Sequence, residues 1–414
     1  MPVQAALIRF RYAVLRAKQE GLWWTARESG RRAILWAGWL LLLPLTIPLH
    51  FAGFRRLPVI TGRIGHLAAE VDCFLKLERL GQIRQKRRRY FLLAPPQKVS
   101  NRCLLDYWRP FVNVISHPLV CGVAELMTRG PLMRHSVAKY VLAIGGAAQY
   151  FSVNAEWEGR QPILKLDRNH RATGERFLRE LGLPAGAWYI CVHAREGGYS
   201  PEDERVHDYR NVSIESLVPA LQEVVRRGGW CIRMGDSSMR PMPKMERVID
   251  YAHHPARSPE MDIFLCASCR FFLGNTSGLF IASSVFGVPS ALTNMVPFAS
   301  MGFSPRDLSM PKLIRSSRDA RLLKASEILG SPVANYRMSG HYRETGLELI
   351  ENSADEITDL VEEMLENLDG KATRGEAVDE LQSRFRSLLH IDHYCYGSAS
   401  NVSARFLARH RHIF

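Results

Sequence analysis

Short apolar runs alternate with helical patterns along most of this chain, and that alternation restricts the fold more than any other feature of the sequence. One series of strand-like runs lies at 58–61, 90–94 and 111–115, and a second lies at 188–193, 229–234 and 270–273. Helical patterns separate these runs, for example from Ile214 to Arg227. Strands that alternate with helices predict parallel sheets. The two series, split near residues 168–187, therefore predict an α/β fold with two Rossmann-like domains that face each other.

The length of the chain also favours more than one domain. It has 414 residues, whereas single hydrophobic cores stop growing at roughly 250–300 residues. The predicted division is a membrane-associating segment at 1–57, a first Rossmann-like domain at 58–180, a second at 181–350, and C-terminal helices at 351–414 that pack back on the body. The sequence at 353–368 predicts a capped amphipathic helix within that last part.

The positive charge is concentrated near the N-terminus. Residues 1–90 carry 17 Lys and Arg against 5 Asp and Glu, whereas the other 324 residues carry 38 against 36. A nucleic-acid binder would more often carry a basic stripe on its folded body. A basic segment ahead of a nearly neutral body is typical of an anchor at an anionic membrane surface. We therefore expect a membrane partner and no nucleic acid.

An apolar run at 33–54 contains no Asp, Glu, Lys or Arg and is long enough to cross a bilayer. Pro44 and Pro48 interrupt it, which favours a broken segment that lies partly in one leaflet. Residues 3–18 form a basic amphipathic pattern typical of membrane-surface helices. The alternative is a helical arm that packs on the body or on a second subunit, which leaves a homo-oligomer open. The basic residues place the body on the cytoplasmic face.

The first candidate motif is Gly62-Arg63-Ile64-Gly65-His66, which follows a strand-like run and opens a helical stretch. Glycines let a ligand approach the backbone, and a helix N-terminus favours anions. The spacing differs from the G-x-G-x-x-G fingerprint of dinucleotide sites. His66 is our first candidate for a catalytic base, and the alternative is a histidine that only caps the helix.

The second motif, His193-Ala194-Arg195-Glu196-Gly197-Gly198-Tyr199, follows another apolar strand. Ligands of open α/β sheets bind at the carboxyl ends of the strands, and an arginine there can bind a diphosphate through two hydrogen bonds. Arg210 and Asn211 belong to the same loop, together with Asp208. Glu196 and Asp203 are further candidates for the base. The alternative for Arg195 is a structural ion pair with Asp203.

The third motif, Asn275-Thr276-Ser277-Gly278, is again a small polar turn between a strand and a helix. Hydroxyl and backbone N–H groups in such a turn can bind an anion. The surroundings of Ser277 do not match the G-x-S-x-G elbow of hydrolases. An ordinary capped helix is the alternative. Asp236, which ends the strand between the last two motifs, is either a contact to a base or ribose or only part of a turn.

Metal ions and cofactors are not expected. No Asp-x-Asp triplet occurs, and Cys266 and Cys269 form a CxxC pair without a second pair. Buried thiols are therefore a better interpretation than zinc. Eight cysteines in a chain of this length are also too few for a disulfide scaffold.

Several motifs in order resemble a bacterial glycosyltransferase family associated with surface polysaccharide assembly. They are Gly62–Leu67, His193–Tyr199 with Arg210 and Asn211, Trp230–Asp236, Phe271–Pro289 and Tyr396–His410, and the resemblance spans roughly residues 58–414. His193-Ala194-Arg195 is also similar to the H-x-R element of fucosyltransferases, in which the arginine binds the donor diphosphate. Here Glu196-Gly197-Gly198 follows, where fucosyltransferases commonly have further basic or polar residues, so fucose itself is not implied.

The resemblance implies a GT-B glycosyltransferase that transfers a sugar from a nucleotide-sugar donor to a glycan or lipid-linked acceptor. It implies that 58–180 binds the acceptor through the loop of Gly62, Arg63 and Gly65, and that 181–350 binds the donor. The predicted donor contacts are His193, Arg195, Arg210, Asn211, Asp236, Asn275, Thr276, Ser277 and Gly278. The nucleotide-sugar is a substrate, no metal or cofactor is implied, and inversion at the anomeric carbon is expected.

With the basic anchor, this resemblance predicts an enzyme at the cytoplasmic face of the inner membrane. Two alternatives remain open from the sequence. One is a nucleotide-sugar epimerase on the same fold, which would need no separate acceptor. The other is a non-catalytic membrane scaffold of a polysaccharide assembly complex.

Overall fold

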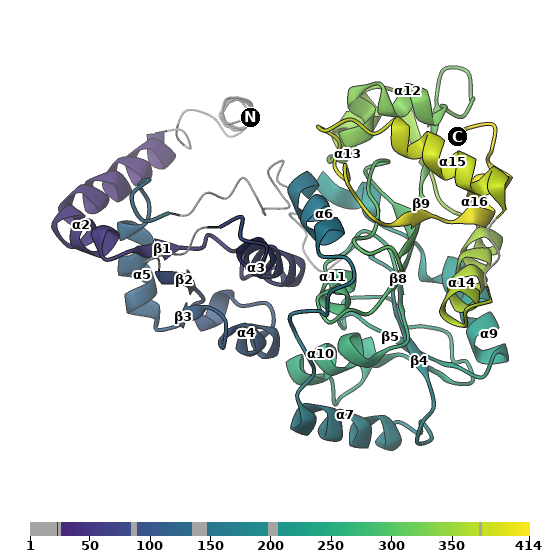
Figure 1. Cartoon of the computed structure of the whole chain (residues 1–414), viewed down its shortest axis with the longest axis horizontal. Helices are drawn as coiled ribbons and strands as arrows, with labels where there is room; N and C mark the ends of the chain where they lie inside the picture. Colours follow the sequence, from purple (N-terminus) through teal and green to yellow (C-terminus); the bar gives the residue numbers. More distant parts are fainter. Residues whose placement is uncertain (1–22, 24–25, 84–88, 135–146, 198–205, 372–374) are drawn as a thin grey trace. The chain divides into compact units, whose positions relative to one another are not determined.

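The computed structural model describes residue 23 and residues 26–83, 89–134, 147–197, 206–371 and 375–414. The chain divides into two compact units, Met1–Ala147 and Ala148–Phe414. Each unit contains a parallel sheet with helices in the connections (Figure 1). The α/β class predicted from the alternation of strands and helices is therefore confirmed, and each unit is described below by itself.

The sheet of the first unit has three described strands in the order β1-β2-β3, all parallel. They are β1 (Phe54–Arg56), β2 (Arg89–Leu93) and β3 (Asn113–Ile115). Helix α3 (Ile64–Arg79) lies between β1 and β2 in the chain, and α4 (Arg102–Trp108) lies between β2 and β3. This strand–helix alternation gives the unit its parallel pairing, because parallel neighbours need a crossover connection.

The first strand lies earlier in the chain than the sequence indicated. Residues 58–61 were expected to be a strand, but the strand that pairs with β2 is Phe54–Arg56. Pro58 has no backbone N–H and cannot donate to a ladder. Thr61 instead bonds to a loop, since its carbonyl accepts from the N–H of Ser100 at 3.0 Å. The prediction of a strand at 58–61 is therefore wrong.

Two apolar helices precede this sheet. They are Ala26–Leu41 and α2 (Leu43–Phe51), and a bend of 61° separates them. Among the described residues no single helix is long and apolar enough to cross a membrane, whereas this bent pair has sufficient length and composition. The apolar run is broken as predicted, but the break lies just before Pro44 in the first turn of α2, whereas α2 continues through Pro48. Residues 3–18 lie outside the described residues.

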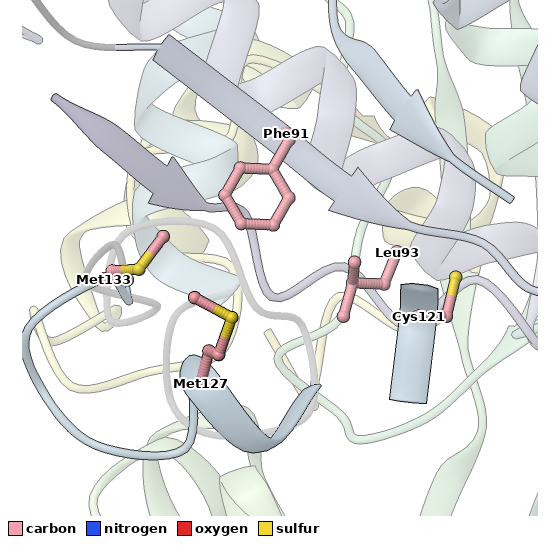
Figure 2. Close-up of a cluster of buried hydrophobic side chains, with 5 residues drawn as sticks. All are labelled: Phe91, Leu93, Cys121, Met127 and Met133. Carbon is pink, nitrogen blue, oxygen red and sulfur yellow. The ribbon is translucent and has the colours of Figure 1, made fainter. Parts of the chain in front are cut away.

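One face of these helices packs on the core of the first unit. Figure 2 shows the buried cluster there, formed by Phe91, Leu93, Cys121, Met127 and Met133. Leu42 and Leu49 pack against this cluster, while other large side chains of the same helices remain exposed. Helix α5 (Pro118–Met127) supplies Cys121 and Met127 to the cluster and also exposes apolar side chains. One side of the apolar run therefore packs on the core of the unit, and the side chains on its other side are exposed.

The second unit is built on a seven-stranded parallel sheet with the order β12-β9-β8-β7-β4-β5-β6. Its strands are β4 (Tyr189–His193), β5 (Trp230–Arg233), β6 (Val248–Ile249), β7 (Phe272–Gly274), β8 (Ser290–Met295), β9 (Leu308–Pro311) and β12 (Asn401–Val402). A separate antiparallel pair joins β10 (Leu313–Ser316) and β11 (Leu347–Ile350). The middle strands are almost entirely buried, as expected for a parallel sheet covered on both faces.

The strand order reverses between β4 and β7. From β4 the chain adds β5 and β6 on one side, and then crosses to place β7, β8 and β9 on the other side. The loops that follow β4 and β7 therefore leave the sheet in opposite directions. Such a reversal is a topological switch point, where open α/β sheets bind ligands at the carboxyl ends of the strands.

The helices of the second unit begin before the boundary that the sequence suggested. They are α6 (Ala147–Glu156), α7 (Arg168–Glu180), α9 (Val218–Arg226), α10 (Pro259–Ser268), α11 (Leu279–Ser284), α12 (Ala325–Leu329), α13 (Ser339–Glu344), α14 (Ala354–Leu368), α15 (Glu376–Ser387) and α16 (Ala404–Arg409). The division lies at 147/148 instead of 180/181, because α7 packs against α10. The C-terminal part contributes β12 to the sheet, and α14 packs on α9 and α16. A Ser353–Glu356 capping box starts α14, as predicted.

The contact between α7 and α10 provides a test of this boundary. A Cβ atom at Gly174 would lie 2.2 Å from the ring of Phe264, which is fully buried and has no room to move. Alanine normally stabilises a helix relative to glycine, but here we expect Gly174→Ala to lower the free energy of unfolding by roughly 1–3 kcal/mol through overpacking. Denaturant unfolding measures this. A stabilised variant would show that α7 does not pack on α10.

Candidate functional site

The switch point of the second unit brings together two of the motifs identified in the sequence. Residues Ala194–Gly197 follow β4, and Asn275–Gly278 follow β7. The two strands are neighbours, with His193 paired to Gly274 at their carboxyl ends. Parallel pairing therefore places Arg195 and Asn275, which are 80 residues apart in the chain, at the same edge of the sheet.

Asn275 connects the motifs. Its side-chain oxygen accepts from the backbone N–H of Arg195 at 3.0 Å, and its amide nitrogen donates to the carbonyl of Arg210 at 2.8 Å. Asn275 is only 1% exposed, so these bonds are made away from water. The carbonyl of Arg195 also accepts from the N–H of Val212 at 3.0 Å. The segment at 207–212 is thus fixed to the ends of both strands.

The side chain of Arg195 is oriented by this segment. Its guanidinium donates to the carbonyl of His207 at 3.0 Å and to the side-chain oxygen of Asn211. Both of these acceptors are neutral oxygens, and they fix the direction of the guanidinium. Asp203, the acid that could have formed a structural ion pair with Arg195, lies outside the described residues. A guanidinium held in place after a strand of a parallel sheet is suited to bind an anion.

Further positive charges lie at the same loop. Burial has the largest effect on Tyr209 and raises its pKa to about 12. The positive charges of Arg210, Arg337 and Arg195 lie close enough to Tyr209 to lower this pKa in part. Arg337 also lies over the ring of Tyr394 at 4.5 Å. The Nε atom of Arg210 is buried and has no hydrogen-bond partner among the described residues. We call Arg195, Arg210 and Arg337 the arginine patch.

Sequence reasoning missed Lys312, which bonds to the backbone of the 207–212 segment beside the arginine patch. It follows β9, and its ammonium group donates to the carbonyls of Asn211 at 2.9 Å and Tyr209 at 3.2 Å. Burial lowers its pKa, and Glu351 at 3.4 Å acts in the opposite direction. Its position after a parallel strand was the available signal, because all such positions meet at one edge of the sheet.

His193 is a buried and neutral part of the strand end. It is 6% exposed, and its Nδ1 lies 3.2 Å from the carbonyl of Met234, so this nitrogen carries the proton that it donates. Burial lowers the pKa of His193 from 6.5 to about 4, with Arg233 contributing in the same direction. We therefore assign His193 to the support of the strand end in its uncharged form.

This lowered pKa predicts a dependence of stability on pH. Between about pH 6.5 and pH 4 the unfolded chain binds more protons at His193 than the folded chain does, so acid favours unfolding. The contribution of uncharged His193 to the free energy of unfolding is complete above pH 6.5 and is lost as the pH falls towards 4. We expect wild type to lose ~2 kcal/mol more than His193→Asn between pH 7 and pH 5. Parallel curves of unfolding free energy against pH would contradict this assignment.

Glu196, the second candidate for the base, accepts one hydrogen bond and lies beside one guanidinium. Its Oε2 accepts from the N–H of Arg240 at 2.9 Å and lies 3.5 Å from the guanidinium of Arg233. Arg233 is fully buried and also bonds to Asp250 at 3.0 Å. A carboxylate beside a buried arginine balances that charge, which favours a structural role for Glu196 over proton transfer.

The remaining donor-side candidates have local partners. Asp236 accepts from the N–H of Ser238 at 2.9 Å, as in an ordinary turn. The hydroxyl of Thr276 lies 3.1 Å from both the N–H and the carbonyl of Val296, which joins the end of β7 to the end of β8. The Ser277 hydroxyl is buried without a partner among the described residues, and Gly278 precedes α11. Since α11 has only six residues, the side chains and not a helix dipole would bind the anion.

The first unit contains a second constellation, the pair of His66 and Glu70. His66 lies in the first turn of α3, and its Nδ1 is 2.7 Å from Oε1 of Glu70. Glu70 is fully buried, and its other oxygen accepts from the N–H of Ile60 at 2.9 Å. A carboxylate at Nδ1 fixes the tautomer, so Nε2 carries the lone pair that can accept a proton. The His66 side chain remains 15% exposed.

Sequence reasoning selected His66 but missed Glu70. The signal was the spacing of four residues, which places two side chains on one face of a helix. The alternative of a capping histidine is not what the structure shows, because the N-cap of α3 is Arg63. Gly62 and Arg63 are exposed and Gly65 is buried at the start of α3. Among the described residues, no group of three or more His, Cys, Asp or Glu side chains could hold a metal ion.

Comparisons with known proteins complete the description. No family profile matches the chain, and no curated protein matches it. Similar solved structures include a glycosyl transferase family 9 protein from Veillonella parvula, with 14% identity, a TM-score of 0.37, and coverage of 73% of this chain and 79% of that one.

Two further similar structures are heptosyltransferases. E. coli ADP-heptose LPS heptosyltransferase II has 10% identity, a TM-score of 0.39, and coverage of 58% and 84% of the two chains. The dodecameric iron-containing heptosyltransferase TibC, in complex with ADP-D-β-D-heptose, has 12% identity, a TM-score of 0.41, and coverage of 76% and 78%. At these identities and TM-scores the similarity carries no argument about function, which therefore rests on the residues of this chain.

Proposed function

We propose that this protein is a glycosyltransferase of the GT-B type that transfers a sugar from a nucleotide-sugar donor. The observation that carries the proposal is the arginine patch at the switch point, where Arg195 is held through both its backbone and its side chain. Switch points bind nucleotides in open α/β sheets, and arginine is the residue best suited to a diphosphate. The half-buried side chains of Tyr209 and Tyr394 beside the patch would add apolar surface for a base or a sugar.

The proposed reaction follows from these charges. The acceptor hydroxyl attacks the anomeric carbon, a new C–O bond forms, and the bond between that carbon and the diphosphate oxygen breaks. The nucleoside diphosphate leaves with the electron pair, and Arg195 stabilises the negative charge that develops on it. Nε2 of His66 takes the proton of the acceptor hydroxyl, while Glu70 stabilises the imidazolium that results. Attack opposite to the leaving group inverts the anomeric carbon.

The acceptor and the location are further parts of this proposal. The exposed apolar side chains of the bent helices and the basic N-terminal charge support attachment to the cytoplasmic face of a membrane. A glycan or a lipid-linked glycan at that surface is the acceptor that such an attachment favours. Bacterial surface polysaccharide biosynthesis is the setting that we propose for it.

A donor panel tests the proposed function. Full-length protein is incubated with nucleotide-sugars that differ in base and sugar, and thermal shift and release of nucleoside diphosphate are both measured. We expect one nucleoside diphosphate to stabilise the protein, and acceptor-dependent release from its sugar conjugate. A new sugar isomer formed without an acceptor would instead indicate an epimerase. If no nucleotide changes the melting temperature, the proposal of an enzyme is refuted and the non-catalytic scaffold is the remaining interpretation.

A further inference from the structure

The first unit contains a cavity of about 340 Å³ that plays no part in the proposed chemistry. It is lined by Trp36, Arg56, Glu125, Thr128, Arg129 and Arg134. Its volume lies at the lower end of the ~300–1,000 Å³ range of small-molecule sites. The lining carries three guanidinium groups and one carboxylate, so the cavity has a net positive charge.

Two of these arginines have buried donors that are not used. The Nε atoms of Arg56 and Arg129 are buried and have no hydrogen-bond partner among the described residues. Arg56 is held by one bond, from its Nη1 to the Thr128 hydroxyl at 3.0 Å, and the guanidinium of Arg129 lies 5.7 Å from the Trp36 ring centre. Buried donors normally have partners, and an uncompensated buried charge is costly. The single carboxylate of the lining therefore leaves these two donors without an acceptor in the described part of the unit.

The pKa of Arg56 supports the same conclusion. Burial lowers it, Glu125 raises it, and the positive charge of Arg134 lowers it further. Glu125 is exposed, so it compensates the buried charge only in part. A bound anion with several oxygens would supply the missing acceptors, since arginine binds phosphate oxygens through parallel N–H bonds.

The position of the cavity indicates where the anion comes from. Trp36 belongs to the apolar helix Ala26–Leu41, Arg56 ends β1, which is the strand after α2, and Arg129 follows α5. Most of the exposed large apolar side chains in the described part of the unit belong to these three helices: Ile34, Leu40, Leu41, Leu45, Ile47, Phe51, Leu119, Val120 and Val123. Arginine and tryptophan beside an exposed apolar surface are typical of the boundary between hydrocarbon and headgroups.

Local packing fixes this arrangement. A Cβ atom at Gly130 would lie 2.4 Å from the ring of Trp39, so only glycine permits the approach of the apolar helix to the segment after α5. Gly38 of the same helix lies against Leu126 of α5, where a Cβ would be in ordinary contact at 3.6 Å. The cavity is therefore formed by elements that pack directly on each other.

We propose that this cavity binds the phosphate headgroup of a membrane lipid, either a monoester or a diphosphate, while the lipid chains lie along the exposed apolar side chains. Binding by itself does not depend on the enzyme's reaction. Only the additional step, that the bound lipid is the sugar acceptor, rests on the proposed function.

Vesicle binding by the full-length protein tests this proposal. The probes are phosphatidylcholine vesicles with phosphatidic acid, which has a phosphate monoester, or with phosphatidylglycerol, which has a diester. Arg56→Lys/Arg129→Lys keeps the charge but removes the planar forks, and Arg102→Lys/Arg109→Lys is the control at arginines outside the cavity in the same unit. We expect the cavity variant to lose binding to phosphatidic acid vesicles by roughly tenfold or more, and the control by less than about twofold.

Other outcomes would overturn the proposal. Equal losses in both variants would show that any surface arginine suffices, and equal binding of the two lipids in vesicles of matched surface charge would show a response to charge alone. If soluble inorganic pyrophosphate raises the melting temperature but does not compete with the vesicles, the cavity is a site for free phosphate and not for a lipid. Because vesicle binding needs no nucleotide-sugar, its failure and a failure of sugar transfer are distinguishable.

Discussion

Replacement of Arg195 by alanine is expected to abolish useful donor binding and to lower turnover by ~10²–10³-fold. Arg195 lies at the switch point, and its guanidinium is held by His207 and Asn211 through neutral oxygens. It would stabilise the charge that develops on the leaving diphosphate, so its loss affects the transition state more than the ground state. Affinity for nucleoside diphosphate is measured by calorimetry, and transfer is measured at saturating donor.

Matched variants separate charge from geometry. Arg195→Lys should recover only part of the activity, because an ammonium lacks the planar fork. Asn211→Ala should have a smaller effect than Arg195→Ala, since it removes one acceptor of the guanidinium and leaves the charge. Arg318→Ala, at an exposed position of the second unit, is the control and should behave as wild type. Wild-type affinity for the diphosphate in Arg195→Ala would refute the donor site.

Removal of the His66 imidazole should lower turnover by ~10²–10⁴-fold while donor affinity stays close to wild type. His66 lies in the first unit, and its Nε2 is the proposed proton acceptor because Nδ1 faces Glu70. Single-turnover transfer by His66→Ala, with donor affinity measured separately, checks this. If turnover falls by less than roughly tenfold in a folded variant, His66 only contacts substrate and another group accepts the proton.

Glu70 is a positioning residue, and its role has a distinct signature. Glu70→Gln keeps the shape of the side chain and can still bond to Nδ1, but it removes the charge that stabilises the imidazolium. We expect a loss of turnover with donor affinity close to wild type, because the imidazolium that forms in the transition state is no longer stabilised. Glu78→Gln, the same replacement near the other end of α3, is the control and should keep wild-type turnover. A Glu70→Gln variant that loses turnover and donor affinity equally would indicate a structural role alone.

Prediction from the sequence worked best for buried strands and for a helix whose first residues form a cap. The strand that ends at His193 and the helix with the Ser353 cap both lie where the sequence places them. The apolar run broken by Pro44 and Pro48 is two helices with a bend of 61° between them. Prediction failed at 58–61, because a run of strand-forming residues does not reveal whether a partner strand lies beside it.

The candidate site could be predicted only in part. Arg195 and Asn275 were selected from strand-to-turn patterns, and the structure connects them directly. Glu70 and Lys312 were missed, because the spacing from His66 and the position after a strand do not by themselves reveal that the side chain is buried and which group it contacts. Glu196 was selected for proton transfer, but in the structure it lies beside the buried guanidinium of Arg233.

The sequence by itself determined the class of fold, the capped and bent helices and the residue types at the strand ends. These follow from periodicity, proline and capping, which act within a few residues. Only the tertiary structure decided which side chains meet. Arg195 and Asn275 are 80 residues apart, and Trp36 and Arg129 come from an apolar helix and from the segment after α5. Their contacts depend on strand order and helix packing, in which many distant apolar residues act together, so no local pattern specifies them.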